Sequence, residues 1–265
     1  MLEKKLKDKD YVSKSPKPET FLREKNYSHH LGTHYCPGCG HGLVNKFIGE
    51  VVDEYNIRDK TIMVASVGCA VFDFWYYDCD RIQVPHGRSP AVATGLKRAR
   101  PECVVITHQG DGDLAAIGTA ETIHAANRGE NISIFFVNNA IYGMTGGQMA
   151  PTTLEGQKST TSPGGRNVQE VGYPIKVCEL LNTLIAPTYI ERVALYDMNH
   201  VRRAKEAVKK SIRIQLKNQG FSLVEFLSPC PTNWGMSVKD ALEFTKKNME
   251  KYYPLGIFRD LEDKK

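Results

Sequence analysis

The chain has 265 residues, of which 41% are hydrophobic and 25% are charged, and its net charge is +5. A chain of this length can bury one large α/β core. It has no apolar run of the roughly 20 residues that cross a membrane, and no apolar segment of a signal peptide follows the N-terminal lysines. The small positive excess does not indicate a nucleic-acid surface. We therefore expect a cytoplasmic protein that binds neither membranes nor nucleic acids.

The order of predicted elements indicates an α/β fold. Residues 1–30 are polar and charged and are predicted to form an N-terminal extension, whereas residues 31–265 are predicted to form one domain. Apolar patterning predicts helices over 42–56, 90–98, 114–127, 174–181 and 200–218, and strands over 61–66, 102–107, 132–137, 184–191 and 222–227. This alternation predicts a mostly parallel sheet with helices on both faces.

Two motifs follow neighbouring predicted strands. Gly110-Asp111-Gly112 comes after the strand that ends at 107, and Asn138-Asn139 comes after the strand that ends at 137. Hard oxygens at adjacent strand ends suit a magnesium ion that also holds phosphates. Either motif alone also fits a capped turn in a loop. Their spacing, and the long segment 142–173 that follows, favour a ligand site.

The seven cysteines form a second constellation. An odd number in a cytoplasmic chain argues against a disulfide framework. Cys36 and Cys39 flank a Pro-Gly turn that aims two thiolates at one point, and Cys69 and Cys230 follow predicted strands. Cys103 and Cys178 are expected to be core residues, and Cys79 is ambiguous. On spacing alone, zinc and an iron–sulfur cluster fit the first four cysteines equally well.

The chain resembles the β subunit of 2-oxoacid:ferredoxin oxidoreductases, which are thiamine diphosphate (TPP) enzymes. The resemblance covers about residues 34–235 and rests on YCPGCGHG (35–42), SVGC (66–69), PHGRSPAVATGLK (85–97), GDGDLAAIG (110–118), NNAIYGMTGGQMAPTT (138–153) and SPCPTN (228–233). It implies that the domain is the TPP diphosphate-binding domain of the thiamin-diphosphate-binding fold. The implied reaction is the oxidative decarboxylation of a 2-oxo acid with coenzyme A, which passes electrons to ferredoxin.

The resemblance also implies particular ligands. It implies a 4Fe–4S cluster on Cys36, Cys39, Cys69 and Cys230, and Mg²⁺ on Asp111, Asn139 and the carbonyl group of Ile141. TPP contacts are implied for Val67, Gly68, Cys69, Ala70, His86, Gly110, Gly112, Asp113, Asn138, Gly143 and Met144. A cluster beside TPP could accept electrons singly, which zinc cannot do, and this favours the cluster. A lone histidine such as His86 is otherwise more often structural.

No catalytic side chain is predicted within this chain. Other TPP enzymes activate the cofactor with a glutamate from a pyrimidine-binding domain, and a chain of this size has no room for that domain. Glu121 and Glu130 are expected to point away from the site. We therefore expect a partner α subunit that supplies the glutamate, with γ or δ subunits as possible further partners.

The sequence leaves alternatives open for the substrate and for the functional class of the protein. We favour 2-oxoglutarate, with branched-chain 2-oxo acids and pyruvate as alternatives. The competing classes are a non-redox TPP lyase or carboligase and a zinc-stabilised module without catalysis. Arg88 could neutralise ligand charge or form a structural ion pair, and Lys97, late in a predicted helix, is expected to be exposed to solvent.

Overall fold

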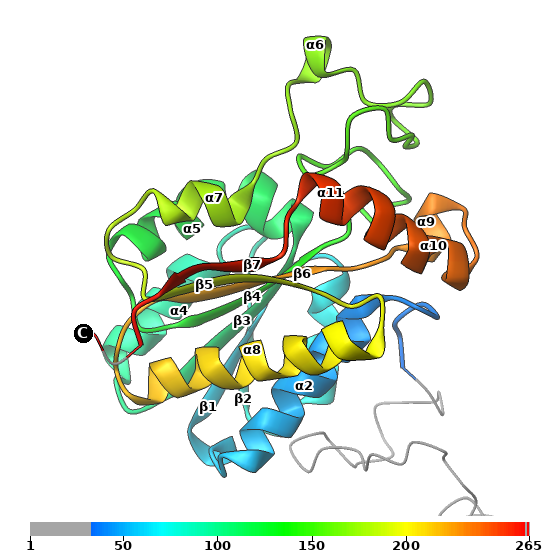
Figure 1. The fold of residues 1–265 in the computed structure, drawn as a ribbon. Coiled ribbons are helices and arrows are strands. Elements are labelled where there is room, and N and C mark those ends of the chain that lie inside the picture. The colour runs from blue at the N-terminus through cyan, green and yellow to red at the C-terminus, as the bar shows by residue number, and fades with distance from the viewer. Residues whose placement is uncertain (1–32, 263, 265) are drawn as a thin grey trace, which may run out of the picture.

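The computed structural model describes residues 33–262 and 264, so the predicted extension over 1–30 lies outside the described residues. Within them, a seven-stranded sheet has the order β2-β1-β3-β4-β6-β5-β7 (Figure 1). Every pair of neighbouring strands is parallel except β5 and β7. The predicted fold class, a mostly parallel sheet with helices on both faces, is confirmed.

The elements have these bounds. The strands are β1 Thr61–Ala65, β2 Asp80–Gln83, β3 Val104–Gly110, β4 Ser133–Asn138, β5 Tyr189–Ala194, β6 Ser222–Leu227 and β7 Gly256–Asp260. The α-helices are α2 Gly40–Glu54, α3 Asp73–Tyr76, α4 Ser89–Ala99, α5 Thr119–Asn127, α6 Val168–Val171, α7 Val177–Asn182, α8 Met198–Leu216, α9 Pro231–Trp234, α10 Val238–Phe244 and α11 Glu250–Tyr252. Short 3₁₀ turns cover Arg58–Lys60 and Cys69–Phe72, and π-helical turns cover Gly112–Ile117 and Thr245–Met249.

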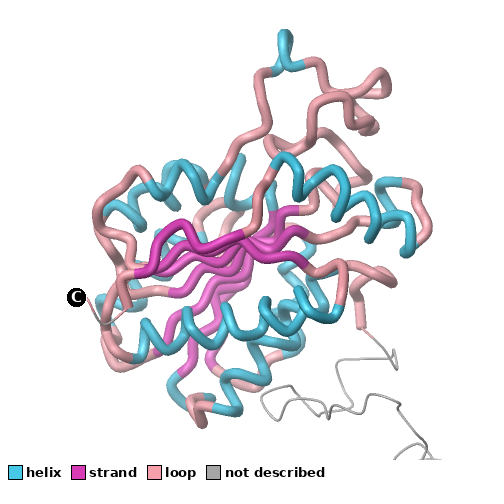
Figure 2. The backbone as a smooth tube through the Cα atoms, viewed as in Figure 1, coloured by secondary structure: helices cyan, strands magenta, loops and turns pink. Residues whose placement is uncertain are grey.

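Helices cover both faces of the sheet, as the tube view shows (Figure 2). On one face, α2 and α8 pack on strand residues such as Met63, Phe135 and Phe226. On the other face, α4, α5 and α7 pack on Val64, Phe136 and their neighbours. The central strands β1, β3, β4, β5 and β6 are buried on both faces. Their nearly continuous apolar runs are typical of parallel strands between two helical layers.

Two edge strands were not predicted from the sequence. In β2 every residue is at least partly exposed, so it carries no apolar pattern, and β7 is also partly exposed. The predicted strand over 184–191 begins too early, because β5 starts at Tyr189 and Ile185 is 90% exposed. The expectation for Lys97 was also wrong. Its ammonium group is buried and donates to the carbonyl oxygens of Pro101 at 2.9 Å and Cys103 at 2.6 Å.

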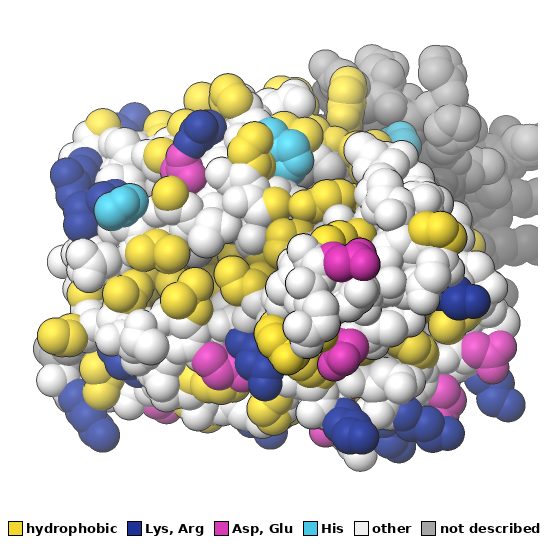
Figure 3. Space-filling view, turned by 90° about the horizontal axis from the view of Figure 1, so that it is seen from above, with side chains coloured by type: hydrophobic (Ala, Val, Ile, Leu, Met, Phe, Trp, Pro, Cys, Tyr) yellow, Lys and Arg dark blue, Asp and Glu magenta, His cyan; other side chains and the backbone are white. Residues whose placement is uncertain are grey.

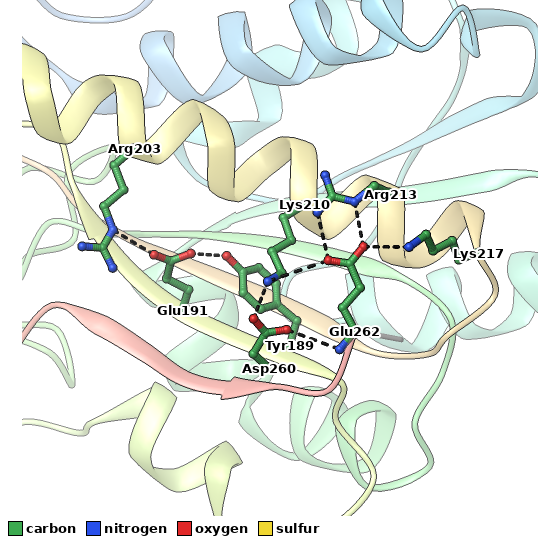
Figure 4. Close-up of polar contacts among 8 residues, drawn as sticks. All are labelled: Tyr189, Glu191, Arg203, Lys210, Arg213, Lys217, Asp260 and Glu262. Carbon is green, nitrogen blue, oxygen red and sulfur yellow. Dashed lines mark hydrogen bonds and ion pairs between the residues drawn. The ribbon is translucent and has the colours of Figure 1, made fainter. Parts of the chain in front are cut away.

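The antiparallel edge strand β7 is tied to α8 by charged side chains (Figure 4). Lys210 pairs with Asp260. Glu262, just after the strand, accepts from Arg213 at 2.7 Å and from Lys217 at 3.1 Å. These pairs hold the C-terminal segment on the sheet edge, away from the carboxyl ends of the central strands.

Candidate functional site

The carboxyl ends of four adjacent strands bring the predicted site residues together. β1, β3, β4 and β6 are consecutive neighbours in the sheet and all parallel. Cys69 follows β1, Asp111 follows β3, Asn139 follows β4 and Cys230 follows β6. This edge is where ligands bind in open parallel sheets. The prediction that these segments converge is confirmed.

Three oxygen-bearing groups meet at the ends of β3 and β4. The terminal amide atom of Asn139 that faces Asp111 lies 2.9 Å from Asp111 Oδ1 and 2.8 Å from the carbonyl oxygen of Ile141. The amide oxygen of Asn139 faces these two acceptors, and only a turned amide group would donate its nitrogen to both of them. Adjacent oxygens of a Mg²⁺ octahedron lie roughly 2.9 Å apart, so with the amide oxygen turned inwards the three groups fit one Mg²⁺ ion.

The Asp111 carboxyl group is almost fully buried. Burial raises its pKa to about 7, against the opposing effect of hydrogen bonds from Thr152 and from backbone amides. A buried carboxylate without a nearby cation is unfavourable, and a bound cation would stabilise its charged form. The environment therefore fits a cation ligand better than a surface turn.

Asp113 organises the loops around the cleft. Its carboxylate accepts hydrogen bonds from His86 Nδ1 at 2.7 Å, Gly87 N at 2.8 Å, Gln109 Nε2 at 2.7 Å, Val67 N at 3.3 Å and Ser89 Oγ at 3.5 Å. Since these donors use both carboxylate oxygens, the Asp113 side chain holds the loops together. His86 Nδ1 points at this carboxylate, which fixes the orientation of the imidazole ring.

A cleft of about 220 Å³ opens at this edge. Most of the predicted cofactor contacts line it: Val67, Gly68, Cys69, His86, Gly110, Gly112, Asp113, Gly143 and Met144, together with Asp111, Asn139 and Ile141. Ala70 and Asn138 do not line the cleft and are buried beside it. The Asn138 amide donates to Glu225 at 2.8 Å and accepts from Ala140 N at 3.2 Å, so it shapes the turn that carries Asn139.

The four candidate cluster cysteines gather beside this cleft. A Cβ atom on Gly143 would lie 3.5 Å from Cys230 Sγ and 3.6 Å from Cys69 Sγ. The Cys36–Cys39 turn packs on the segment after β6, because Gly40 N donates to Ser228 Oγ at 3.0 Å. In the part of the chain that the structure describes, no three His, Cys, Asp or Glu side chains are close enough to hold one metal ion.

The thiols of this group influence one another. Burial, with smaller contributions from the other cluster-candidate cysteines, raises the pKa of Cys39 and of Cys69 to about 12 each. Burial also raises the pKa of Cys230. Such thiols stay protonated until a metal or cluster binds and releases their protons. Gly143 has no side chain between the sulfur atoms of Cys69 and Cys230, and this open space fits a group larger than a single ion.

The remaining cysteines lie elsewhere. Cys103 is buried just before β3, and Cys178 is buried in α7 with its thiol 3.1 Å from Glu225. The Cys79 thiol is partly buried and donates to the carbonyl oxygen of Asp80 at 3.5 Å. None of the three lines the cleft.

Charged side chains near the cleft are mostly paired. Arg88 forms an ion pair with Glu121, which favours its structural role. Glu130 pairs with Arg98 and Arg128. Neither glutamate lines the cleft, in agreement with their expected orientation away from it.

One feature of the site was missed by the sequence analysis. His41 lines the cleft, and its Nδ1 lies 3.0 Å from His108 Nε2. His108 Nδ1 in turn lies 2.8 Å from Asp73, which also accepts from Tyr35 at 3.0 Å. Burial and His108 lower the pKa of His41. His41 stands in the quoted CPGCGHG motif and His108 precedes the GDG turn, but nothing in the sequence pairs either with Asp73.

Exposed hydrophobic side chains rim the cleft. Ile117 and Met144 line it and are 52% and 46% exposed. Figure 3 shows hydrophobic side chains gathered across the face seen from above. Among the described residues, no helix has the length and apolar character of a membrane span.

Comparisons with known proteins identify the family of this chain. The family model described as "Thiamine pyrophosphate enzyme, C-terminal TPP binding domain" matches residues 67–226. Ketoisovalerate oxidoreductase subunit VorA of Methanothermobacter thermautotrophicus is 51% identical over 95% of this chain and 53% of its own length. The VorA subunit of Methanothermobacter marburgensis is 54% identical over 91% of this chain and 50% of its own. The chain thus spans about half the length of these two relatives.

For two further matches, the aligned region covers a larger share of the matched protein. 2-Oxoglutarate synthase subunit KorB of Archaeoglobus fulgidus is 37% identical over 83% of this chain and 78% of its own length. A solved structure of 2-oxoglutarate:ferredoxin oxidoreductase from Magnetococcus marinus, with 2-oxoglutarate, coenzyme A and succinyl-CoA bound, superposes with a TM-score of 0.69. Its sequence is 26% identical, and the match covers 91% of this chain and 88% of that one. From its TPP-binding domain and these relatives, the chain belongs to the β-type subunits of the 2-oxoacid:ferredoxin oxidoreductase family.

Proposed function

We propose that this chain is the TPP- and cluster-carrying subunit of an enzyme that oxidatively decarboxylates a branched-chain 2-oxo acid. The products are the acyl-CoA, carbon dioxide and two electrons that leave for ferredoxin. The observation that carries the proposal is the shared wall between cleft and thiols. Cys69 and Gly143 line the cleft, and Gly143 also lies against the sulfur atoms of Cys69 and Cys230.

We propose that the diphosphate half of TPP lies over the end of β3. Asp111, Asn139 and the Ile141 carbonyl group would hold Mg²⁺, and the backbone around Gly112 would approach the phosphates. A Cβ atom on Gly112 would lie 3.2 Å from the Tyr142 ring, so a larger residue would narrow the cleft. The predicted contacts of Val67, Gly68, Ala70, His86, Asp113, Asn138 and Met144 belong to the same proposal, with Ala70, Asp113 and Asn138 acting by shaping the loops.

We propose that Cys36, Cys39, Cys69 and Cys230 hold a 4Fe–4S cluster. Bound TPP supplies the electron sink for loss of carbon dioxide, and the cluster accepts electrons one at a time. This chain itself positions the cluster ligands. It holds the four thiols beside the cleft, and Asn233 donates to Cys230 Sγ at 3.5 Å and to the Gly143 carbonyl oxygen at 2.8 Å. Hydrogen bonds to cluster sulfurs are one means of setting the reduction potential.

The relatives lead us to propose a different substrate from the one that the sequence analysis favours. The sequence analysis favoured 2-oxoglutarate, but the two VorA relatives at 51% and 54% identity carry ketoisovalerate in their names. The relatives named for 2-oxoglutarate are less similar, at 36–37% identity. The preference for 2-oxoglutarate is therefore not supported, and we propose ketoisovalerate or a similar branched-chain 2-oxo acid.

We propose that another polypeptide region, a partner α subunit or an equivalent domain, completes the site. The cleft is smaller than the roughly 300–1,000 Å³ of usual ligand pockets, and Ile117 and Met144 leave apolar surface exposed on its wall. Exposed apolar surface beside a ligand cleft is typical of a protein interface. In this proposal the partner brings the glutamate that activates TPP, since neither Glu121 nor Glu130 lines the cleft.

The proposed activity can be tested with the complex co-purified under anaerobic conditions. With coenzyme A and a viologen dye, we expect reduction of the dye that is fastest, by kcat/KM, with ketoisovalerate. Asp111→Asn should abolish it, whereas Asp240→Asn on α10 should not. Faster turnover of 2-oxoglutarate would refute the proposed substrate. No dye reduction with any 2-oxo acid would refute the proposed reaction.

A further inference from the structure

The segment Ala150–Thr153 contacts both sides of the candidate magnesium site. Thr152 Oγ1 donates to Asp111 Oδ2 at 2.5 Å, at the end of β3. Thr153 Oγ1 donates to the Ala140 carbonyl oxygen at 2.7 Å, just after β4. Both threonine side chains are fully buried. Two consecutive hydroxyl groups therefore bridge the two strand ends that carry the candidate ligands.

This segment is itself firmly held. Arg166 donates to the carbonyl oxygens of Ala150 at 3.0 Å, Pro151 at 3.1 Å and Thr153 at 2.9 Å. Tyr253 donates to the Thr152 carbonyl oxygen at 2.7 Å. Its backbone is therefore a fixed support, and the Thr152 hydroxyl keeps its direction towards Asp111.

The contact assigns different roles to the two oxygens of Asp111. Oδ1 faces the Asn139 amide group at 2.9 Å, whereas Oδ2 is occupied by Thr152. Hydrogen bonds to a carboxylate are short and strong, so this oxygen is costly to withdraw for another ligand. Oδ2 thus has a hydroxyl donor that competes with a cation, whereas Oδ1 faces the second candidate ligand, Asn139.

The number of available carboxylate oxygens matters for the choice of cation. Mg²⁺ demands near-octahedral geometry at about 2.0–2.1 Å, whereas Ca²⁺ takes 6–8 oxygens at roughly 2.3–2.6 Å and often binds a carboxylate through both oxygens. We propose that Thr152 is a specificity-determining residue that makes Asp111 a single-oxygen ligand and so selects Mg²⁺ over Ca²⁺. The proposal rests on the proposed TPP and Mg²⁺ site.

The test is metal-dependent TPP binding, measured by calorimetry on the protein co-purified with its partner, with either Mg²⁺ or Ca²⁺. Thr152→Val keeps the shape of the side chain but frees Oδ2. Loss of a partner that orients a metal ligand typically changes metal affinity by about 10–100-fold. We expect the preference for Mg²⁺ over Ca²⁺ to fall by about tenfold or more in this variant, and Thr152→Ser, which keeps the hydroxyl, to restore it.

A matched control separates selectivity from folding. Thr245 is also fully buried, and its hydroxyl donates to the Ala241 carbonyl oxygen at 2.9 Å, away from the cleft. Thr245→Val should leave the Mg²⁺ to Ca²⁺ ratio unchanged. If Thr152→Val does not fold, Thr152→Ala also removes the donor and should lower the ratio.

The outcomes distinguish the two proposals. If the unaltered protein binds no TPP with either metal, the proposed cofactor site is wrong and this inference fails with it. If the unaltered protein binds TPP with Mg²⁺ but the Thr152 variants keep its Mg²⁺ to Ca²⁺ ratio, the inference alone is overturned, even if both affinities weaken.

Discussion

A buried ion-pair network behind the cleft yields a quantitative prediction. The Arg192 guanidinium group is fully buried and donates to Glu225 Oε2 at 2.9 Å and to Glu179 at 2.6 Å and 3.0 Å. Glu225 Oε1 accepts from the Asn138 amide group at 2.8 Å. The same carboxylate thus neutralises Arg192 and fixes the residue that precedes the candidate magnesium ligand Asn139.

The change Glu225→Gln cannot satisfy both partners. An amide has one oxygen, and in either orientation its NH₂ group faces a donor, either Arg192 Nε or Asn138 Nδ2. Breaking a buried ion pair costs about 3–5 kcal/mol. Arg192 keeps its ion pair with Glu179. We therefore expect the free energy of unfolding to fall by the lower end of this range, about 3 kcal/mol. At roughly 2–4 °C per kcal/mol for a domain of this size, Tm should fall by about 6–12 °C.

Thermal unfolding followed by calorimetry measures this change directly. The control is Glu243→Gln, which removes an exposed pair with Lys247 in which the two side chains are 50% and 73% exposed. Because solvent screens an exposed pair, that variant should leave Tm nearly unchanged. Equal shifts of Tm in the two variants would refute the reasoning that burial makes the Glu225 pair important.

The remaining predictions concern the thiols and the C-terminal segment. In Gly143→Ala the added Cβ would fill space 3.5 Å from Cys230 Sγ, so bound iron should fall while Tm of the iron-free chain stays unchanged. Cys230→Ser should lose iron, by elemental analysis, whereas Cys103→Ser should keep it. The Arg213 hydrogen bond lowers the pKa of Glu262 to about 2. Its stabilisation is therefore present above its usual pKa of about 4.3 and lost towards pH 2, and Glu262→Gln should flatten the acid side of the stability curve.

Three results would contradict these predictions. If Gly143→Ala kept its full iron content, the cluster would not occupy the space between the sulfur atoms of Cys69 and Cys230. Iron loss in Cys103→Ser equal to that in Cys230→Ser would contradict the assignment of ligands. An acid stability curve that Glu262→Gln leaves unaltered would show that its pairs contribute nothing to folding.

The central part of the fold was predictable because buried parallel strands leave a strong local signal. Strand β6 was predicted with its observed bounds, and β4 to within one residue at each end. Once the strands were placed, the parallel arrangement alone brought Asp111 and Asn139 to the same edge. The edge strands β2 and β7 were missed, because partly exposed strands carry no continuous apolar run.

The supporting residues of the site were not predictable, because their contacts join distant parts of the chain. Thr152 lies 41 positions from Asp111, and Glu225 lies 87 positions from Asn138. A threonine in a loop or a glutamate in a strand shows no local pattern that names its partner. The burial of Lys97 was missed for a related reason, since its acceptors are backbone carbonyl groups that any sequence has.

The central claim is that one edge of this sheet holds TPP and a 4Fe–4S cluster side by side. The most direct measurement is the iron, sulfide, zinc and TPP content of the protein, purified without oxygen and equilibrated with TPP and Mg²⁺. The account predicts iron and labile sulfide in equal amounts, about four of each per chain, together with bound TPP. One zinc per chain with no iron or sulfide would contradict it.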